Sequence, residues 1–411
     1  MLDYLDRLET RTPKARDLAN YRDLKAIIAL AKPRAAGLRR HMRQAKLADI
    51  KSRDDLLQLP ILRKADLAQM TELEPPFGGF NSARPGLLRH VFPGALAGQA
   101  KDWWGAARAL HAAGFRRGDL IHNGFSYHLD SAGHLIESGA QALGCGVIPA
   151  GSVSVERHLE VIEKLRPTGF CGKAGFLDLL LEKAAELRCD ISSLKRAFVF
   201  GAPLTSHMRA SIEARGIRLY QAYATPSLGV VAYETDNRDG QLNDGMVLNE
   251  GLILEVVKPG TQQSVAAGEI GEMVVTRLNL DCPVLRFGTG DLTALLSEPS
   301  PCGRTNLRIK GWLGRADQAV QLGEQTVSPA QMIDLAARHA SVRRLRLVLT
   351  RERKRDALVL HAESAQPADG LAKELSATLK VLTGLDAKIE LVPVGALPDD
   401  GQLIVDERSP A

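Results

Sequence analysis

The chain has 411 residues, enough for two or more domains, and its 45% hydrophobic and 25% charged residues are typical of a folded globular protein. The formal net charge of +5 is small for this length, and the lysines and arginines are scattered, so we expect no nucleic-acid partner. No apolar stretch reaches the ~18 residues that a membrane-spanning helix needs, so we expect no membrane partner. The first residues mix acids and bases without an apolar core, which argues against secretion.

The five cysteines are spread along the chain without a metal-binding or disulfide pattern. None of them forms a C-x-x-C pair, so neither a zinc site nor a disulfide framework is predicted. Unpaired cysteines are typical of a reducing compartment. We therefore expect a cytoplasmic protein with no metal site.

Taken in chain order, residues 1–70 read as helices with polar breaks, among them Pro33 and a turn at Leu59–Pro60 before a helix near Lys64. From residue 103 to residue 223, apolar runs alternate with helical runs. Strands are expected at 119–123, 145–149, 168–171, 196–200 and 219–223, and helices at 103–113, 131–143, 155–165, 175–187 and 206–215. This alternation predicts a mainly parallel sheet covered by helices on both faces, with 145–149 as a buried strand.

After residue 228 the pattern changes to strands joined by short turns. They are expected at 230–234, 252–257, 271–276 and 284–287, which favours an antiparallel, barrel-like subdomain. The last hundred residues start afresh, with a helix at 329–340, a strand pair at 345–349 and 357–361, a helix at 370–382 and a strand at 388–392. The predicted organisation is α/β, with a large N-terminal body over residues 1–313 and a small α+β domain over residues 314–411.

The sharpest local motif is Leu285-Arg-Phe-Gly-Thr-Gly-Asp291, an apolar strand that runs into a Gly-Thr-Gly turn. One carboxylate can accept two hydrogen bonds at once, which suits the cis-diol of a ribose. The alternative is a simple turn aspartate, because short motifs also occur by chance.

Some twenty residues later, Ile309 is followed by Gly311-Trp-Leu-Gly-Arg315-Ala-Asp317. With this motif the chain resembles the adenylate-forming superfamily of acyl- and aryl-CoA ligases, and its phenylacetate-CoA ligase branch in particular. The resemblance extends over essentially the whole chain and rests on the order and spacing of further segments, namely 59–67, 143–149, 199–202, 220–229, 244–255, 268–272 and 317–329.

The resemblance implies a fold, a reaction and a set of site residues. Such enzymes join a carboxylate to AMP, and after the small domain has rotated as a lid, the CoA thiol attacks the activated carbonyl. AMP or ATP and CoA are therefore the implied cofactors, and an aryl or acyl acid or its CoA thioester is the implied small-molecule partner. The resemblance assigns cofactor binding to Asp291, Arg315, Tyr223, Gly201, Ala202 and Ile309, and the substrate pocket to Phe125, Tyr127 and His128.

Three of these residues also have a simpler interpretation. Tyr223 is otherwise a core aromatic, Arg315 is otherwise paired with Asp317 in a hinge, and a lone His128 is more often structural than chemical.

Several positions depart from the pattern of the branch. The segment matching the phosphate loop, residues 90–100, has no Ser or Thr and contains Pro93, which lacks an N–H donor. Ser227 stands where the branch has a magnesium-binding glutamate, and a neutral hydroxyl is a poor lone ligand, so a Mg²⁺ ion is doubtful. Gln402 stands where it has a lysine that acts during adenylation. Lys101 and Lys173 are the residues to test as substitutes.

Three functions remain open on the sequence. The first is a phenylacetate-CoA ligase-like protein that acts on or binds an aryl or acyl carboxylate or its CoA thioester, with ATP-dependent adenylation weakened or lost. The second is a non-catalytic homologue that binds a nucleotide or acyl-CoA. The third is an acyl-transferring enzyme that uses a preformed thioester, with His128 or Cys145 as the reactive group. The sequence leaves open the substrate, the pathway and whether the chain forms a homodimer.

Overall fold

The computed structural model describes residues 3–43, 50, 52–83, 89–91, 95–98, 101–322, 325–352, 355–364, 370–398 and 400–408. The chain divides into two compact units. The first unit combines Met1–Gly201 with Ile217–Gly311, and the second combines Ala202–Gly216 with Trp312–Ala411. The change of unit between Gly311 and Trp312 falls close to residue 314. The predicted domain boundary at residue 314 stays a prediction.

The N-terminal region is helical, as predicted. Its elements are η1 (Arg7–Thr10), α1 (Pro13–Ala31), α2 (Ala36–His41), α3 (Arg53–Leu57) and α4 (Lys64–Leu73). The hydroxyl of Thr12 caps α1 by accepting the N–H of Ala15 at 3.2 Å, and Pro13 fits the first turn because that position needs no N–H donor. The helix ends two residues before Pro33, as the sequence predicts.

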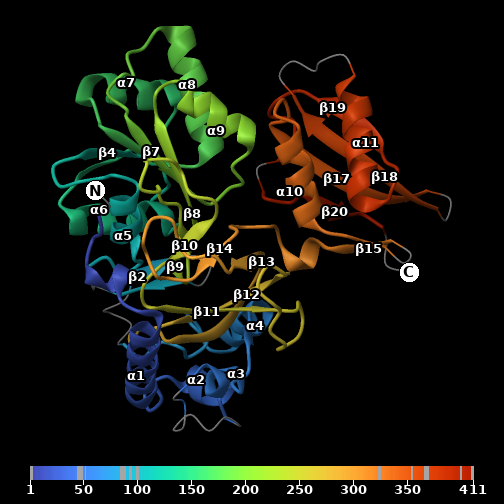
Figure 1. The fold of residues 1–411 in the computed structure, drawn as a ribbon. Helices are drawn as coiled ribbons and strands as arrows, with labels where there is room; N and C mark the ends of the chain where they lie inside the picture. Colours follow the sequence, from blue (N-terminus) through green and yellow to red (C-terminus); the bar gives the residue numbers. More distant parts are fainter. Residues whose placement is uncertain are drawn as a thin grey trace. The chain divides into compact units, whose positions relative to one another are not determined.

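A twelve-stranded sheet forms the centre of the first unit, and five of its strands run parallel to one another (Figure 1). Their order is β8-β7-β6-β4-β5, with β4 (Leu120–Asn123), β5 (Gly146–Pro149), β6 (Gly169–Gly172), β7 (Arg196–Val199) and β8 (Arg218–Thr225). Helix α5 (Ala106–Ala112) precedes β4, and α6 (Ala132–Leu143), α7 (Val155–Leu165) and α8 (Ala174–Leu187) follow between the strands. The α5–α6 and α7–α8 pairs lie on opposite sides of these strands, which confirms the α/β fold.

Two details of the parallel part were wrong in the sequence prediction. The strand predicted as buried at 145–149 is β5, which lies at the sheet edge, so its residues are only partly covered. The helix predicted from Trp103 begins only at Ala106, because Gly105 has a φ of 72° and a turn precedes it.

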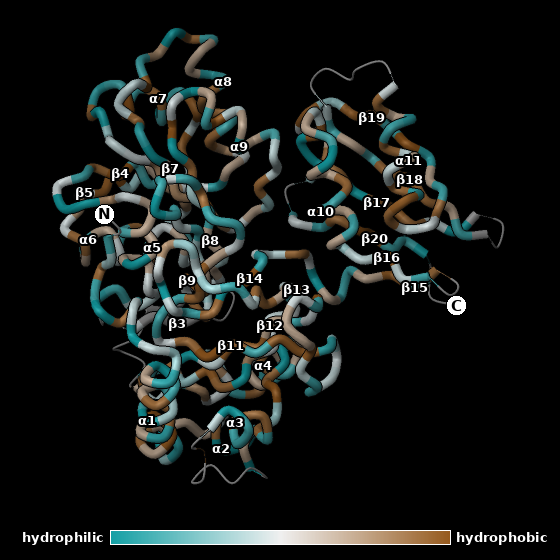
Figure 2. Tube along the Cα trace, viewed as in Figure 1, coloured by the Kyte–Doolittle hydropathy of each residue, from teal (hydrophilic) through white to brown (hydrophobic). Residues whose placement is uncertain are grey.

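The same sheet continues through antiparallel strands. They are β9 (Gly229–Tyr233), β10 (Met246–Leu248), β11 (Leu252–Val257), β12 (Ile270–Arg277), β13 (Val284–Leu296) and β14 (Arg308–Ile309), and β1 (Leu62–Arg63) pairs with β13. A separate hairpin joins β2 (Arg89–Val91) to β3 (Ala95–Ala97). β11 is buried along its whole length and is drawn largely in the hydrophobic colour (Figure 2).

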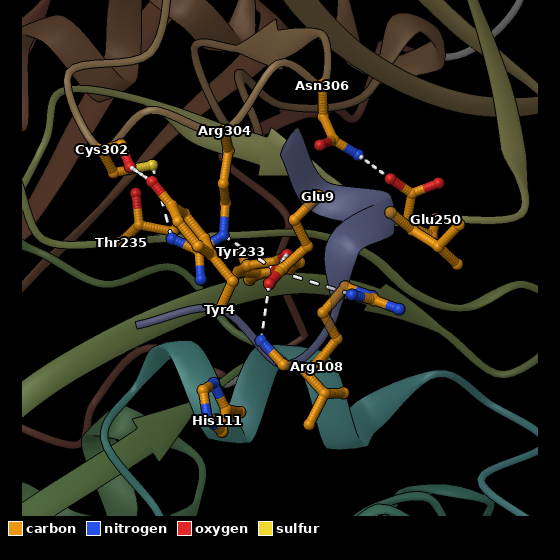
Figure 3. A network of polar contacts seen from close by, with 12 residues as sticks. Tyr4, Glu9, Arg108, His111, Tyr233, Thr235, Glu250, Cys302, Arg304 and Asn306 are labelled. Carbon is orange, nitrogen blue, oxygen red and sulfur yellow. Dashed lines mark hydrogen bonds and ion pairs between the residues drawn. The ribbon is translucent and has the colours of Figure 1, made fainter. Parts of the chain in front are cut away.

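The segment before α1 is anchored to the sheet by a buried charge network around Glu9 (Figure 3). The carboxylate of Glu9 is fully buried and accepts hydrogen bonds from Arg304 Nε at 2.9 Å and from Tyr233 Oη at 3.1 Å. Its other oxygen accepts the N–H of Leu5 at 2.8 Å, and Arg108 lies 3.8 Å away. The buried carboxylate is therefore both hydrogen-bonded and paired with cations, as a buried charge must be.

The second unit has a sheet of its own, with the strand order β19-β18-β17-β20. It contains α9 (Ser206–Glu213), η4 (Ala316–Gln318), β15 (Val320–Leu322), β16 (Gln325–Val327), α10 (Pro329–Arg338), β17 (Arg344–Glu352), β18 (Arg355–Glu363), α11 (Leu371–Thr383), β19 (Lys388–Val392) and β20 (Ile404–Asp406). The predicted pairing of 345–349 with 357–361 is confirmed, since Leu349 lies opposite Leu358. A core of buried leucines fills the space under α10 and α11.

Candidate functional site

Asp291 lies within a continuous strand rather than in a turn, which corrects the sequence prediction. β13 runs through the Gly-Thr-Gly motif, and its register against β12 shifts there. Gly288 pairs with Val274 and Leu292 with Glu272, so Thr289, Gly290 and Asp291 bulge out of the ladder. Gly290 has a φ of 74°, which only glycine adopts without strain. The bulge therefore removes Asp291 from the regular pairing of β13 with β12.

Tyr223 on β8 and Asp291 on β13 meet although their strands are not adjacent in the sheet. The hydroxyl of Tyr223 donates a hydrogen bond to Asp291 Oδ2 at 2.6 Å, and the Asp291 N–H bonds the hydroxyl of Thr289 at 3.1 Å. Tyr223 is buried on β8, whereas Asp291 is half-buried. A half-buried carboxylate fixed in this way has the hydrogen-bonding chemistry that a ribose diol needs.

Ser227 lies at the turn between β8 and β9, where Thr225 pairs with Gly229. The turn is braced through its main chain, since Trp104 Nε1 donates to the carbonyl of Pro226 at 3.3 Å and Arg277 Nη1 donates to that of Ser227 at 3.1 Å. In the part of the chain that the structure describes, no group of three or more His, Cys, Asp or Glu side chains could hold a metal ion.

Arg277 and Trp103 form a compact stack against this turn, a feature that the sequence reasoning missed. The guanidinium carbon of Arg277 lies 3.7 Å from the centre of the Trp103 ring, and Arg277 also donates to the carbonyl of Trp103. Burial lowers the pKa of Arg277 to about 10, so the side chain remains charged at neutral pH. The available signal was an arginine at the end of the apolar run Met273-Val-Val-Thr-Arg277.

The three predicted substrate-pocket residues have different surroundings. Phe125 is buried and its ring lies 4.1 Å from that of Phe200. Tyr127 is half-buried and accepts a hydrogen bond from Asn123 Nδ2 at 2.7 Å. His128 is exposed. All three lie on the loop after β4. Their assignment to a substrate pocket stays a prediction.

Asn123 is a further residue at this loop that the sequence reasoning missed. It is fully buried at the end of β4, and its amide also donates to the carbonyl of Gly133 at 2.9 Å and accepts the N–H of Phe125 at 3.2 Å. One buried amide therefore fixes both ends of the loop.

The remaining predicted residues are distributed over both units. Ile309 is buried on β14 in the first unit, where Gly201 is exposed with a φ of 79°, and Ala202 belongs to the second unit. Arg315 forms the bidentate ion pair with Asp317 that the simpler interpretation foresaw, at 2.6 and 2.9 Å.

Gln402 is exposed in the second unit, in a loop held by its neighbours. Arg346 donates to the carbonyl of Gln402 at 3.2 Å, and Gln318 bonds both the carbonyl of Gly401 at 3.3 Å and the N–H of Leu403 at 3.2 Å. The loop is therefore ordered, although the side chain at its tip carries no charge.

The predicted phosphate-loop segment is described only in part. Residues 92–94 and 99–100, which include Pro93, lie outside the described residues. Gly98 is described, and a Cβ there would overlap the Asp281 carboxylate and the indole nitrogen of Trp103. The end of this segment is therefore packed directly on the Trp103–Arg277 stack. Lys101 and Lys173 are both exposed.

Known proteins share this architecture over nearly the whole chain. A family model described as "AMP-binding enzyme" matches residues 126–280. The phenylacetate-coenzyme A ligase of Thermus thermophilus is 28% identical over 91% of this chain and 92% of its own. That of Aromatoleum evansii is 28% identical over 84% of this chain and 82% of its own. A crystal structure of 2-hydroxyisobutyryl-CoA ligase in the postadenylation state, in complex with 2-HIB-AMP, is 25% identical with a TM-score of 0.85, covering 98% of this chain and 91% of that one.

The matched family model and the phenylacetate-CoA ligase relatives support a place for this chain in the adenylate-forming superfamily, in its phenylacetate-CoA ligase-like branch. Members of this acyl-CoA ligase family bind AMP or ATP and CoA. In this phenylacetate-CoA ligase-like chain no described helix has the length and apolar character to cross a membrane.

Proposed function

We propose that this phenylacetate-CoA ligase-like protein binds an aryl or acyl carboxylate in activated form, as an adenylate or a CoA thioester, with ATP-dependent adenylation weakened or lost. The observation that carries the proposal is the contrast between two parts of the site. The hydroxyl of Tyr223 holds the Asp291 carboxylate at 2.6 Å, which supports its predicted role toward a ribose, whereas Ser227 and Gln402 supply no charge where the branch uses charged groups.

Adenylation builds negative charge on the reacting phosphate, and fixed charges in a closed site contribute most to its stabilisation. The Ser227 turn does not fit a Mg²⁺ ion, because one neutral hydroxyl is a poor ligand for a hard cation. The uncharged Gln402 donates hydrogen bonds but cannot replace an ammonium group. Ribose binding by Asp291 needs neither a metal nor a lysine, so nucleotide binding can persist without adenylation.

The domain organisation is part of this proposal. Residues 314–411 would act as a lid on the body formed by residues 1–313, with the hinge at Gly314-Arg315-Ala-Asp317. The Arg315–Asp317 ion pair supports an ordered hinge, and the separate sheet of the C-terminal region supports a unit that can move as one body.

A non-catalytic nucleotide- or acyl-CoA-binding homologue is the second candidate, and the same uncharged positions favour it. An acyl-transferring enzyme is less well supported. Cys145 is buried, burial raises the pKa of its thiol to about 11, and the thiol donates to the carbonyl of Arg116 at 3.1 Å. A thiol in that state is a poor nucleophile.

The test measures binding first and chemistry second. Calorimetry and thermal shift with AMP, ATP, CoA and aryl- and acyl-CoA thioesters should detect binding of AMP and of a thioester, since a ligand raises apparent stability by mass action. Asp291→Ala should abolish AMP binding with an unchanged circular dichroism spectrum, and Asp239→Ala, at an exposed loop carboxylate, should leave it unchanged.

Carboxylate-dependent exchange of pyrophosphate into ATP separates the proposal from ordinary ligase activity. We expect little or no exchange over a panel of aryl and fatty acids. Robust exchange at low enzyme concentration would overturn the proposal and direct attention to Lys101 and Lys173.

A further inference from the structure

The Trp103–Arg277 stack fills the place where two parts of the predicted phosphate site meet. Gly98 comes from the predicted phosphate-loop segment and Ser227 from the predicted metal position. Gly98 lies against the Trp103 indole, and the Ser227 carbonyl accepts a hydrogen bond from Arg277. Trp103 and Arg277 are each only 6% exposed, so the two segments are joined by packed side chains.

The charge of Arg277 is held by protein groups. Within the described chain it makes no ion pair, and it contacts the carbonyls of Ser227 and Trp103 and the Trp103 ring. The carboxylates whose charges act on it are Asp102 and Asp281. Asp102 accepts the amides of Ala106 and Ala107 at 2.8 and 3.0 Å, so it is fixed in place.

The balance of these charges is unfavourable for a polyphosphate. Burial raises the pKa of Asp102 to about 6, so this carboxylate is mostly ionised at neutral pH. Asp281 lies 3.4 Å from the Trp103 indole nitrogen. One guanidinium engaged by carbonyls and two carboxylates leave no net positive charge to offset the added charge of a β- and a γ-phosphate.

The predicted ribose position uses other side chains than the stack. Tyr223 on β8 and Asp291 at the β13 bulge bond each other, whereas Trp103 and Arg277 contact one another and Arg277 bonds the turn at Ser227. A nucleotide with a short phosphate could therefore use Asp291 without entering the filled space.

We propose that the Trp103–Arg277 stack is a specificity determinant that makes the site select a nucleoside monophosphate or its acyl ester over a nucleoside triphosphate. The inference rests on the proposed function and adds the class of nucleotide to it. Selection works by exclusion, because a packed side chain and nearby carboxylates penalise the larger anion.

The experiment compares affinities for AMP and ATP by calorimetry in EDTA, with the ratio of the two dissociation constants as the readout. Partial unfolding of a variant weakens both nucleotides equally and leaves the ratio unchanged. The wild type should favour AMP by at least about tenfold. Trp103→Ala should bring the ratio close to one, since it opens the space and keeps the charge of Arg277.

Two further variants separate volume from general damage. Arg277→Met keeps most of the volume and should retain the preference for AMP. Arg308→Ala removes another buried arginine that donates to main-chain carbonyls, those of Glu298, Pro299 and Asp244, and should leave the ratio unchanged.

Equal binding of ATP and AMP by the wild type, or an unchanged ratio in Trp103→Ala, would overturn the stack as a determinant while AMP binding through Asp291 still stood. A wild type that binds neither nucleotide but does bind an acyl-CoA would overturn the stack and the nucleotide part of the proposed function together.

Discussion

The Glu9 network and the Trp103–Arg277 stack both bury arginine, but they balance its charge differently. Arg304 meets the Glu9 carboxylate at 2.9 Å inside a closed set of donors and acceptors (Figure 3). Arg277 meets two carbonyls and an aromatic face. A buried charge that is paired and fully hydrogen-bonded fixes a segment to the core. A buried charge that is held by carbonyls at a turn fixes the conformation of that turn. The first arrangement concerns stability, and the second lies at the candidate site.

The largest effect should come from breaking the Glu9 network. Glu9→Gln keeps the shape but removes the charge, which leaves Arg304 without its buried counter-ion, whereas Arg108 keeps its ion pair with Asp6. We expect a loss of about 3–5 kcal/mol in the free energy of unfolding, the usual result of removing one partner of a buried pair. Urea unfolding followed by circular dichroism measures it. Exposed Glu163→Gln is the control, and a loss as small as the control's would contradict the comparison.

A buried histidine pair sharpens the comparison through pH. His122 Nε2 and His158 Nδ1 lie 2.7 Å apart, and both side chains are fully buried. Burial, with a smaller contribution from the charge of His158, lowers the pKa of His122 to about 3, and burial also lowers that of His158. In the unfolded chain each ring titrates near ~6.5. Each ring has a lower pKa in the folded protein than in the unfolded chain. Its full contribution to the free energy of unfolding is therefore present above pH ~6.5.

This stability should be lost as the pH falls from about 6.5, at about 1.4 kcal/mol per pH unit for each proton taken up. Urea unfolding at pH 7.5, 6 and 5 measures the slope in the wild type and in His122→Asn. The variant should have the shallower slope. Equal slopes would mean that the pair does not titrate on unfolding.

The smallest effect on stability should come from Arg277→Met. It removes two hydrogen bonds to carbonyls and the contact with Trp103, but it also removes the cost of burying a charge. We expect a loss of about 1–2 kcal/mol by the same urea measurement. A loss as large as that of Glu9→Gln would show that Arg277 is an anchor of the same kind, and would contradict the difference drawn between the two regions.

Much of the fold followed from local patterns, because strand and helix periods are written in consecutive residues. The alternation between residues 103 and 223 and the strand pair at 345–349 were predicted on that basis. The edge position of β5 was not predictable, since burial of a strand depends on its neighbours in the sheet and not on its own apolar residues. The Gly-Thr-Gly run was equally compatible with a turn and with a bulge, and the partner strand decides between them.

Residues of the candidate site could be predicted only where they belong to a recognisable sequence motif. Asp291 and Tyr223 could be named from the sequence, although their hydrogen bond could not, because 68 positions separate them. Arg277 was missed since a single cation in an apolar strand carries no periodic signal. Asn123 was missed because its three bonds all depend on how one loop folds back.

The bulge at Thr289-Gly290-Asp291 also determines how this segment tolerates changes in length. Upstream of it β13 is fixed by Arg286, which is fully buried and bonds both oxygens of Glu255 at 2.9 Å. Downstream it pairs with β14 at Leu295. With both ends held, deletion of one residue would have to be absorbed within the bulge, and side chains in a strand alternate between two faces. Such a deletion would flatten the bulge and displace the Asp291 carboxylate, so the segment should tolerate substitutions more readily than a change in its number of residues.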